Sequence, residues 1–207
     1  MAGLPRTTAL VAVTLVIAGA LAPQPAHAYS TRVHIFYANQ IHDALADGDG
    51  TTIPLVGSEE EVVIDPQDAD AILDFPEYFR GGAVGPDNFM FPAMTDGTHA
   101  IGQHPYDQCE ILYDEAILPQ ERAYALGCFL HGATDAIAHH YVNFLTGETF
   151  TLTPISAGRE QDFINVVRHI VSESMIQHAV VSDNPDRFTA ALLNHSVPYG
   201  LVMRTFF

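Results

Sequence analysis

The chain has 207 residues, and its 25 acidic residues outnumber its eight basic residues, all arginine, which gives a formal charge of −17. A charge of this sign repels polyanions, so the composition argues against nucleic-acid binding through a basic face. The same excess of carboxylates suits a protein that binds hard or borderline cations.

The first 28 residues have the three parts of a secretory signal peptide. Arg6 supplies the positive start, ALVAVTLVIAGALA is a short apolar core, and the small residues AHA end at Ala28. The apolar run is too short for a stable membrane span, so we expect cleavage after Ala28 and a secreted or periplasmic protein that begins at Tyr29. Loss of Arg6 leaves seven arginines against 25 acids, a charge of −18. Residues 29–207 are long enough to form one domain.

Helical periodicity dominates the mature chain. We predict helices over residues 30–48, 65–79, 106–118, 120–145, 159–181 and 185–196. Residues 51–64 are predicted to be irregular or briefly extended. Residues 80–105 are rich in Gly and Pro and lack periodicity, which predicts a long ordered loop with a functional role. The fold class is therefore all-α, a single-domain helical bundle with long ordered loops.

Ligand-type side chains follow one face of the predicted helix over 120–145. His131, Asp135 and His139 are four residues apart, so on a helix they lie about 6 Å apart along one face. The helix over 159–181 repeats the spacing with His169 and Glu173. A single histidine on such a face is more often an ordinary core residue. Two matched pairs on separate helices instead favour a metal site in the core of the bundle.

The Gly-rich segment adds further candidate ligands. Asp87 in GGAVGPDNF is either a turn acid, since Gly-Pro-Asp is common in turns, or a carboxylate held over the end of the bundle. His99 in GTHAIGQHP, with His104 as the competing choice, would supply an imidazole from the same segment. Oxygen and imidazole ligands without thiolate suit zinc, although manganese and iron also bind such sets.

Cys109 and Cys128 are the two cysteines of the chain. Export to an oxidising compartment permits a disulfide, which on the chain-entropy model would stabilise the fold by roughly 3 kcal/mol. The sequence does not supply the geometry that a disulfide requires, so the bridged and reduced states both stay open at this point.

Three segments resemble the zinc-dependent phospholipase C family, particularly its branch similar to glycosylphosphatidylinositol-specific phospholipase D. AYALGCFLHGATDAIAHHYVN resembles the family's His-x-x-x-Asp-x-x-x-His helix, FRGGAVGPDNF its Gly-x-x-x-Pro-Asp segment, and RHIVSES its later His-x-x-x-Glu helix. The matches cover most of the mature chain in the family's order. The same trinuclear site occurs in the fungal single-strand-specific nucleases.

The resemblance implies up to three zinc ions. The implied ligands are Asp87, His99, His131 and Asp135 for one ion, His139, His169 and Glu173 for a second, and the amine and carbonyl of Tyr29, His34 and a bridging Asp135 for the third. The family's first residue is usually tryptophan, so Tyr29 keeps the aromatic character but changes the side chain. Asp87 is also implied as the catalytic residue that orients or deprotonates the attacking water.

The implied reaction is hydrolysis of a phosphodiester by zinc-activated hydroxide attacking phosphorus in line. We expect a phospholipid or related phosphodiester as substrate, peripheral contact with a membrane, and a monomer. A single-strand-specific nuclease is the alternative enzyme, but the mature chain has seven arginines, no lysine and no tryptophan to follow a strand. A secreted protein that binds zinc without turnover is the alternative outside enzymes.

Overall fold

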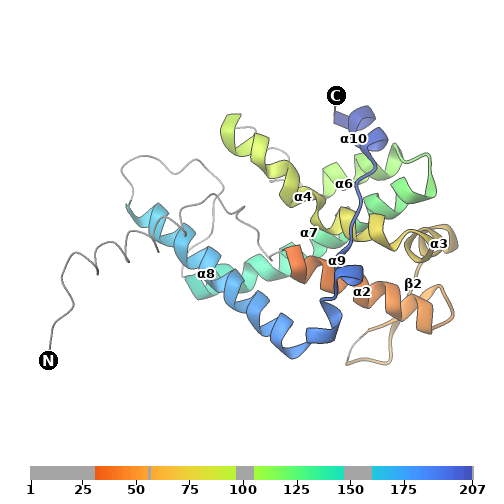
Figure 1. The fold of residues 1–207 in the computed structure, drawn as a ribbon, viewed down its shortest axis with the longest axis horizontal. Coiled ribbons are helices and arrows are strands. Elements are labelled where there is room, and N and C mark those ends of the chain that lie inside the picture. The colour runs from red at the N-terminus through yellow and green to blue at the C-terminus, as the bar shows by residue number, and fades with distance from the viewer. Residues whose placement is uncertain (1–30, 56, 97–104, 147–159, 207) are drawn as a thin grey trace, which may run out of the picture.

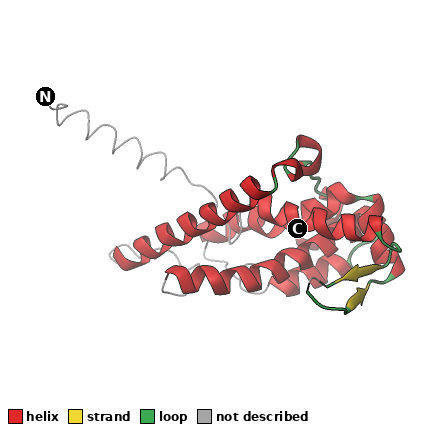
Figure 2. Ribbon diagram, turned by 90° about the horizontal axis from the view of Figure 1, so that it is seen from below, coloured by secondary structure: helices red, strands yellow, loops and turns green. Residues whose placement is uncertain are grey.

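The computed structural model describes residues 31–55, 57–96, 105–146 and 160–206. Within these ranges, the side chains of residues 87–96, 105–106, 139, 160–163 and 165–166 are not described. The predicted signal peptide over 1–28 lies outside the described residues. The described chain is mostly helical and forms one body with a small hairpin at its edge (Figures 1 and 2).

The elements follow the predicted order closely. The first are α2 (Thr31–Asp47), β1 (Thr52–Pro54), β2 (Glu61–Val63), α3 (Pro66–Asp74) and α4 (Pro76–Asp96). They are followed by α6 (Pro105–Asp114), α7 (Pro119–Thr146), α8 (Glu160–Asp183), the 3-10 helix η1 (Pro185–Arg187), α9 (Ala190–Leu193) and α10 (Tyr199–Phe206). The two strands are antiparallel, with Ile53 opposite Val62. The all-α fold class is confirmed, while the helix predicted over 185–196 is divided into η1 and α9.

The long loop predicted over 80–105 is wrong for residues 80–96, which belong to α4. Glycine weakens an isolated helix by about 1 kcal/mol per residue, which explains the prediction. In the fold, however, a Cβ on Gly82 would lie 1.9 Å from the carbonyl oxygen of Tyr124. A Cβ on Gly127 would lie 2.0 Å from the carbonyl oxygen of Phe79. The glycines thus bring the backbones of α4 and α7 into contact, and this packing outweighs the local propensity.

The long helix α7 runs through the middle of the molecule, with α8 at one end and α3, α6 and α10 toward the other (Figure 1). Its first half packs on α6, where Cys109 and Cys128 form a disulfide with their Cα atoms 5.3 Å apart. The bridged state is therefore the one present, and it is typical of proteins in oxidising compartments. Among the described helices, none combines the length and the apolar character needed to cross a membrane.

Ion pairs and hydrogen bonds fix the first half of α7 to its neighbours. Arg122 donates to Asp68 of α3 and to the hydroxyl of Tyr113 of α6. Glu121 accepts hydrogen bonds from Arg204 of α10 and from the backbone N–H groups that precede α7, including that of Leu118 at 3.1 Å. The last contact is the helix-capping role that glutamate often takes at the third helical position.

A buried network positions α2 against α4. The guanidinium of Arg80 donates to the carbonyl oxygen of Asn194 at 2.6 Å and to the side-chain oxygen of Asn39 at 3.1 Å. The amide of Asn39 donates in turn to the carbonyl oxygen of Leu192 at 3.0 Å. These bonds hold the middle of α2 in place, one to two turns after His34.

Candidate metal centre

His131 is oriented by the backbone of α4. Its Nδ1 lies 2.8 Å from the carbonyl oxygen of Ala83, and the ring is buried. A carbonyl oxygen only accepts hydrogen bonds, so we assign the hydrogen to Nδ1. In the neutral ring, Nε2 then carries a lone pair, and this atom lies 3.1 Å from Oδ2 of Asp135. The contact between α4 and α7 therefore determines which nitrogen of His131 is available to a metal.

His34 of α2 is oriented by the same helix that carries His131. Its Nδ1 lies 3.0 Å from Oγ1 of Thr134, and its ring is fully buried. The hydroxyl of Thr134 itself lies within 3.0 Å of the carbonyl oxygens of Leu130 and His131, to which it donates. We therefore assign the hydroxyl as the acceptor from Nδ1 of His34, which leaves the lone pair of His34 on Nε2, 3.4 Å from Oδ1 of Asp135.

The two imidazoles and Asp135 converge on one point. One ligand atom from each of His34, His131 and Asp135 lies within 4.8 Å of the others. All three are acceptor atoms in the assigned tautomers, and neutral imidazole with an outer N–H hydrogen bond is the usual form of a metal-binding histidine. The chemistry of these donor atoms indicates that the group could hold one metal ion.

 The same chemistry favours a cation over two protonated rings. The rings of His34 and His131 are stacked, with centroids 4.1 Å apart and planes at 24°. Protonation of both would place two positive charges in contact in a buried site, where repulsion is strong and solvation is weak. A metal ion held by His34, His131 and Asp135 would instead bring a single centre of positive charge to these acceptor atoms.

A second histidine–carboxylate pair lies beside this group on α8. His169 and Glu173 are both buried, and Nε2 of the first lies 2.6 Å from Oε1 of the second. Burial lowers the pKa of His169 to about 4, although the nearby negative charge of Asp135 opposes this shift. Helix α8 packs against α7 and α2, the two helices that carry the first group. At neutral pH His169 is uncharged, which is the form that binds metals.

The structure brings three of the nine residues predicted from the sequence into one group and two more into a separate pair. His34, His131 and Asp135 form the group, and His169 and Glu173 form the pair on α8. Asp87 lies in α4, one helical turn beyond Ala83, and His139 lies in α7, one turn beyond Asp135, but their side chains are not described. Tyr29, His99 and the competing His104 lie outside the described residues.

Comparisons with protein-family models, with curated proteins and with solved structures found no match for this chain.

Sequence reasoning missed two groups that orient the candidate ligands. The hydroxyl of Thr134 contacts His34, and the carbonyl oxygen of Ala83 contacts His131. A backbone carbonyl leaves no signature in the sequence. Thr134 stands between two predicted ligands, and a hydroxyl residue next to a ligand position is the signal that would have drawn attention to it.

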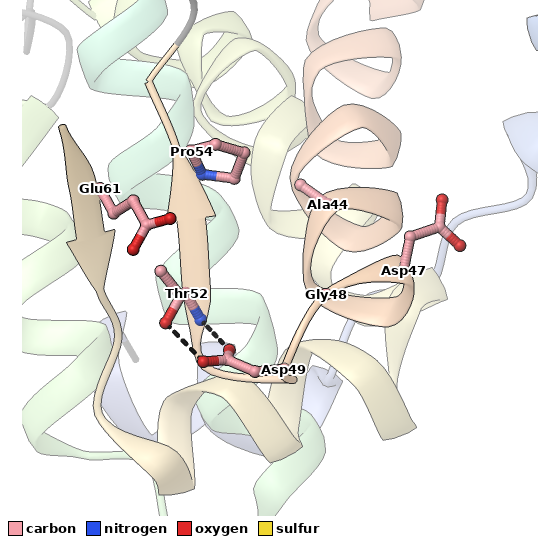
Figure 3. A pocket seen from close by; sticks show the side chains of 7 residues that line it. All are labelled: Ala44, Asp47, Gly48, Asp49, Thr52, Pro54 and Glu61. Atoms are coloured by element: carbon pink, nitrogen blue, oxygen red, sulfur yellow. Dashed lines mark hydrogen bonds between the residues drawn. The ribbon is translucent and has the colours of Figure 1, made fainter. Parts of the chain in front are cut away.

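A separate acidic cleft lies between α2 and the hairpin, with a volume of about 430 Å³ (Figure 3). Asp49 is one of its lining residues, but its carboxylate accepts hydrogen bonds from the backbone N–H groups of Thr51 and Thr52 at 2.8 and 2.7 Å. These bonds lower the pKa of Asp49 and close the turn from α2 into β1. Asp49 therefore has a local structural role in this turn. The residues that line the cleft include no histidine, unlike the group around Asp135.

Proposed function

We propose that the chain is an exported, zinc-dependent phosphodiester hydrolase of the phospholipase C type. The observation that carries the proposal is the convergence of two oriented imidazole nitrogens and one carboxylate in a buried site, from His34, His131 and Asp135. The second ion implied by the resemblance, at His139, His169 and Glu173, would have three protein ligands, which leaves a position for water or substrate, whereas a structural zinc site has four protein ligands.

The donor atoms support zinc, and their number supports more than one ion. Imidazole and carboxylate ligands without thiolate are common in catalytic zinc sites. His169 and Glu173 on α8 would contribute to a second ion next to the first. The amine and carbonyl of Tyr29, with His34, would complete a third, as the resemblance to the phospholipase C family implies. Zinc in up to three positions is therefore our proposal for the cofactor.

The residues of this chain have separate roles in the proposed reaction. The chemistry that zinc supplies when bound is Lewis-acid activation of water, whose pKa it brings to about 7. Asp135 directs one oxygen toward each of the two histidines, so its carboxylate would share a bound metal with both rings. Asp87 is proposed to orient or deprotonate the attacking water. Its position in α4, one turn beyond the Ala83 carbonyl that contacts His131, supports this role.

Surface properties support a phospholipid over a nucleic acid as substrate. The formal charge of −17 disfavours a polyanionic strand. The second half of α7 exposes large apolar side chains, with Phe144 81% and Leu145 65% exposed, and Ile137 and Tyr141 lie on the same helix with more than half of their surfaces exposed. Exposed apolar groups of this kind favour peripheral contact with lipid, which would bring the substrate to the helix that carries Asp135.

The proposed location follows from two features. The Cys109–Cys128 disulfide fits an oxidising compartment, and residues 1–28 have the composition of a signal peptide. We therefore propose a secreted or periplasmic monomer that begins at Tyr29.

The test combines metal content with activity. Protein that has been exported and cleaved would be analysed by elemental mass spectrometry, beside a form with extra residues before Tyr29. Both would be assayed on phosphatidylcholine vesicles and on single-stranded DNA, with and without a chelator.

We expect nearly three zinc ions per chain, fewer in the extended form, and lipid hydrolysis that the chelator abolishes. Hydrolysis of DNA but not of lipid would show that the protein is a nuclease and would overturn the proposed phospholipase activity. Zinc binding without either activity would leave a secreted zinc-binding protein, and less than one zinc in both forms would overturn the proposal.

A further inference from the structure

Thr134 joins the two helices that supply the imidazoles. It lies on α7, directly before Asp135, and its Oγ1 is 3.0 Å from Nδ1 of His34 on α2. The contact links residues 100 positions apart in the chain. It is therefore a tertiary contact at the candidate metal centre and not part of local helix structure.

The direction of this hydrogen bond is set by the helix itself. The Thr134 hydroxyl has one hydrogen, and the carbonyl oxygens of Leu130 and His131 at 3.0 and 2.9 Å are its acceptors. Threonine in a helix adopts the rotamers that permit this bond. With its hydrogen so committed, the oxygen presents a lone pair to His34, and Nδ1 of His34 must be the donor.

We propose that Thr134 is a positioning residue for the metal centre, which fixes the tautomer and the ring orientation of His34 so that its Nε2 faces Asp135. The role parallels that of the Ala83 carbonyl oxygen toward His131. The Nδ1 hydrogen of each imidazole is thus directed toward an oxygen acceptor, a side-chain hydroxyl for His34 and a backbone carbonyl for His131. The inference rests on the metal centre of the proposed function, but it does not depend on the reaction or the substrate.

Loss of the hydroxyl would have a specific effect on His34. Without an acceptor at Nδ1, the ring can carry its hydrogen on Nε2 and donate it to Oδ1 of Asp135, 3.4 Å away. That tautomer has no lone pair for a metal at this position. Loss of a group that orients a metal ligand typically costs 10–100-fold in metal affinity, and we expect a loss of about this size.

The experiment compares three substitutions of Thr134 with a matched control. Thr134→Val keeps the shape and removes the hydroxyl, Thr134→Ala does so with a good helix former, and Thr134→Ser keeps the hydroxyl. Thr205→Val is the control, because Thr205 of α10 also donates to the carbonyl oxygen four residues before it, at 2.9 Å. Zinc affinity would be measured by competition with a chromophoric chelator, and cobalt(II) spectra would report the ligand geometry. Thermal unfolding of the metal-free proteins would report the fold.

We expect Thr134→Val and Thr134→Ala to lose about 10–100-fold in zinc affinity, with a changed cobalt spectrum and little change in metal-free unfolding. Thr134→Ser and Thr205→Val should bind zinc within a few-fold of the unchanged protein. Equal affinity and equal spectra in all variants would overturn the role of Thr134 while leaving the proposed function standing. If the unchanged protein binds no metal, both the inference and the proposed function fail. Metal binding that depends on Thr134, in a protein without phosphodiesterase activity, would support the inference and overturn only the function.

Discussion

Buried polar groups are arranged differently along the two halves of α7. In the first half, a cation meets an anion within the protein, as when Arg122 contacts Asp68. From His131 onward, the part that we call the second half of α7, His131 and Asp135 bring acceptor atoms together with His34 of α2, with both imidazole hydrogens turned outward. The first arrangement balances its charge with groups of the chain, whereas the second is suited to a cation from solution.

We propose from this difference that the first half of α7 maintains the fold and that the second half contributes ligands to a metal ion. The first half also carries the disulfide and the glycine contact with α4. A ligand that binds only the folded state adds stability in proportion to its concentration and affinity, so metal should stabilise the protein through the second half. Four substitutions test this division.

The largest effect on metal binding is expected from Asp135→Asn. The amide can donate to an imidazole lone pair but is a poor metal ligand. Loss of a group that only orients a ligand typically costs about 10–100-fold in metal affinity, and we expect a larger loss of zinc affinity here. The metal-free protein should be as stable as before, or more stable, because a charge has left the acceptor cluster. Chelator competition and urea unfolding without metal measure the two effects.

Asp114→Asn, on the exposed end of α6, is the control for that substitution. If Asp135→Asn instead lowered metal-free stability and left zinc affinity unchanged, Asp135 would be part of an ordinary ion pair. The contrast between the two halves of α7 would then disappear.

The largest effect on stability is expected from Gly127→Ala. The new Cβ would lie 2.0 Å from the carbonyl oxygen of Phe79 and 2.8 Å from the backbone nitrogen of Ala83, and backbone cannot move aside as a flexible side chain can. We expect a loss of about 3 kcal/mol or more in the free energy of unfolding. Zinc affinity should fall as well, because the same contact positions the carbonyl oxygen that orients His131.

Gly200→Ala provides the comparison, since a Cβ there would meet its nearest side-chain atoms, in Arg204 and Glu121, at 3.5 and 3.9 Å. In α10 this change should be neutral or stabilising by up to about 1 kcal/mol. Chemical denaturation of both variants measures their free energies of unfolding. Equal changes in the two variants would mean that the α4–α7 contact is not tight.

Removal of the disulfide should cost about 3 kcal/mol, the entropy of closing a loop with a sequence separation of 19 residues. A double variant, Cys109→Ser with Cys128→Ser, should unfold at lower urea concentration and should no longer respond to a reductant. Its zinc affinity should be unchanged, because the bond lies in the first half of α7. Parallel losses of stability and zinc affinity would show that the halves are coupled.

The smallest effect, about 2 kcal/mol, is expected from Glu121→Gln, which removes charge from hydrogen bonds to Arg204 and to backbone N–H groups. Burial alone would raise the pKa of Glu121, but these bonds outweigh it and lower the pKa below its ordinary value of 4.5. A lowered folded pKa means that the stabilisation is present above pH 4.5 and is lost as the pH falls toward the folded pKa.

The difference in stability between the unchanged protein and Glu121→Gln should therefore shrink as acid is added from pH 6. Unfolding curves at several pH values measure this difference. Glu110→Gln, at an exposed position of α6, should show no such trend. A difference that stays constant through the acid range would mean that the charge of Glu121 contributes nothing.

Much of the fold was predictable because local signals agree with the tertiary structure. Apolar spacing indicated α2, and Pro119 marked the start of α7, where proline is tolerated at the first helical position. The path of α4 was not predictable, since Gly82 and Pro86 oppose a helix locally and only the packing against α7 favours one.

Part of the candidate site was predictable, because residues four apart on a helix lie on the same face. The spacing of four placed His131 and Asp135 together, but no local pattern links them to His34, about 100 residues away, and that pairing came from the family resemblance. The orienting groups were not predictable, because the hydroxyl of Thr134 and the carbonyl oxygen of Ala83 acquire their roles only when α2 and α4 pack on α7.

Because α7 is uninterrupted, the number of residues between two of its positions determines the directions in which their side chains point. Gly127, at the contact with α4, and His131 are one helical turn apart on an uninterrupted helix. Insertion of one residue between them would rotate every later side chain by about 100°, turning Asp135 away from His34. Natural variation in this stretch should therefore take the form of substitution at constant length, while the turn between β1 and β2, remote from the site, is free to lengthen or shorten.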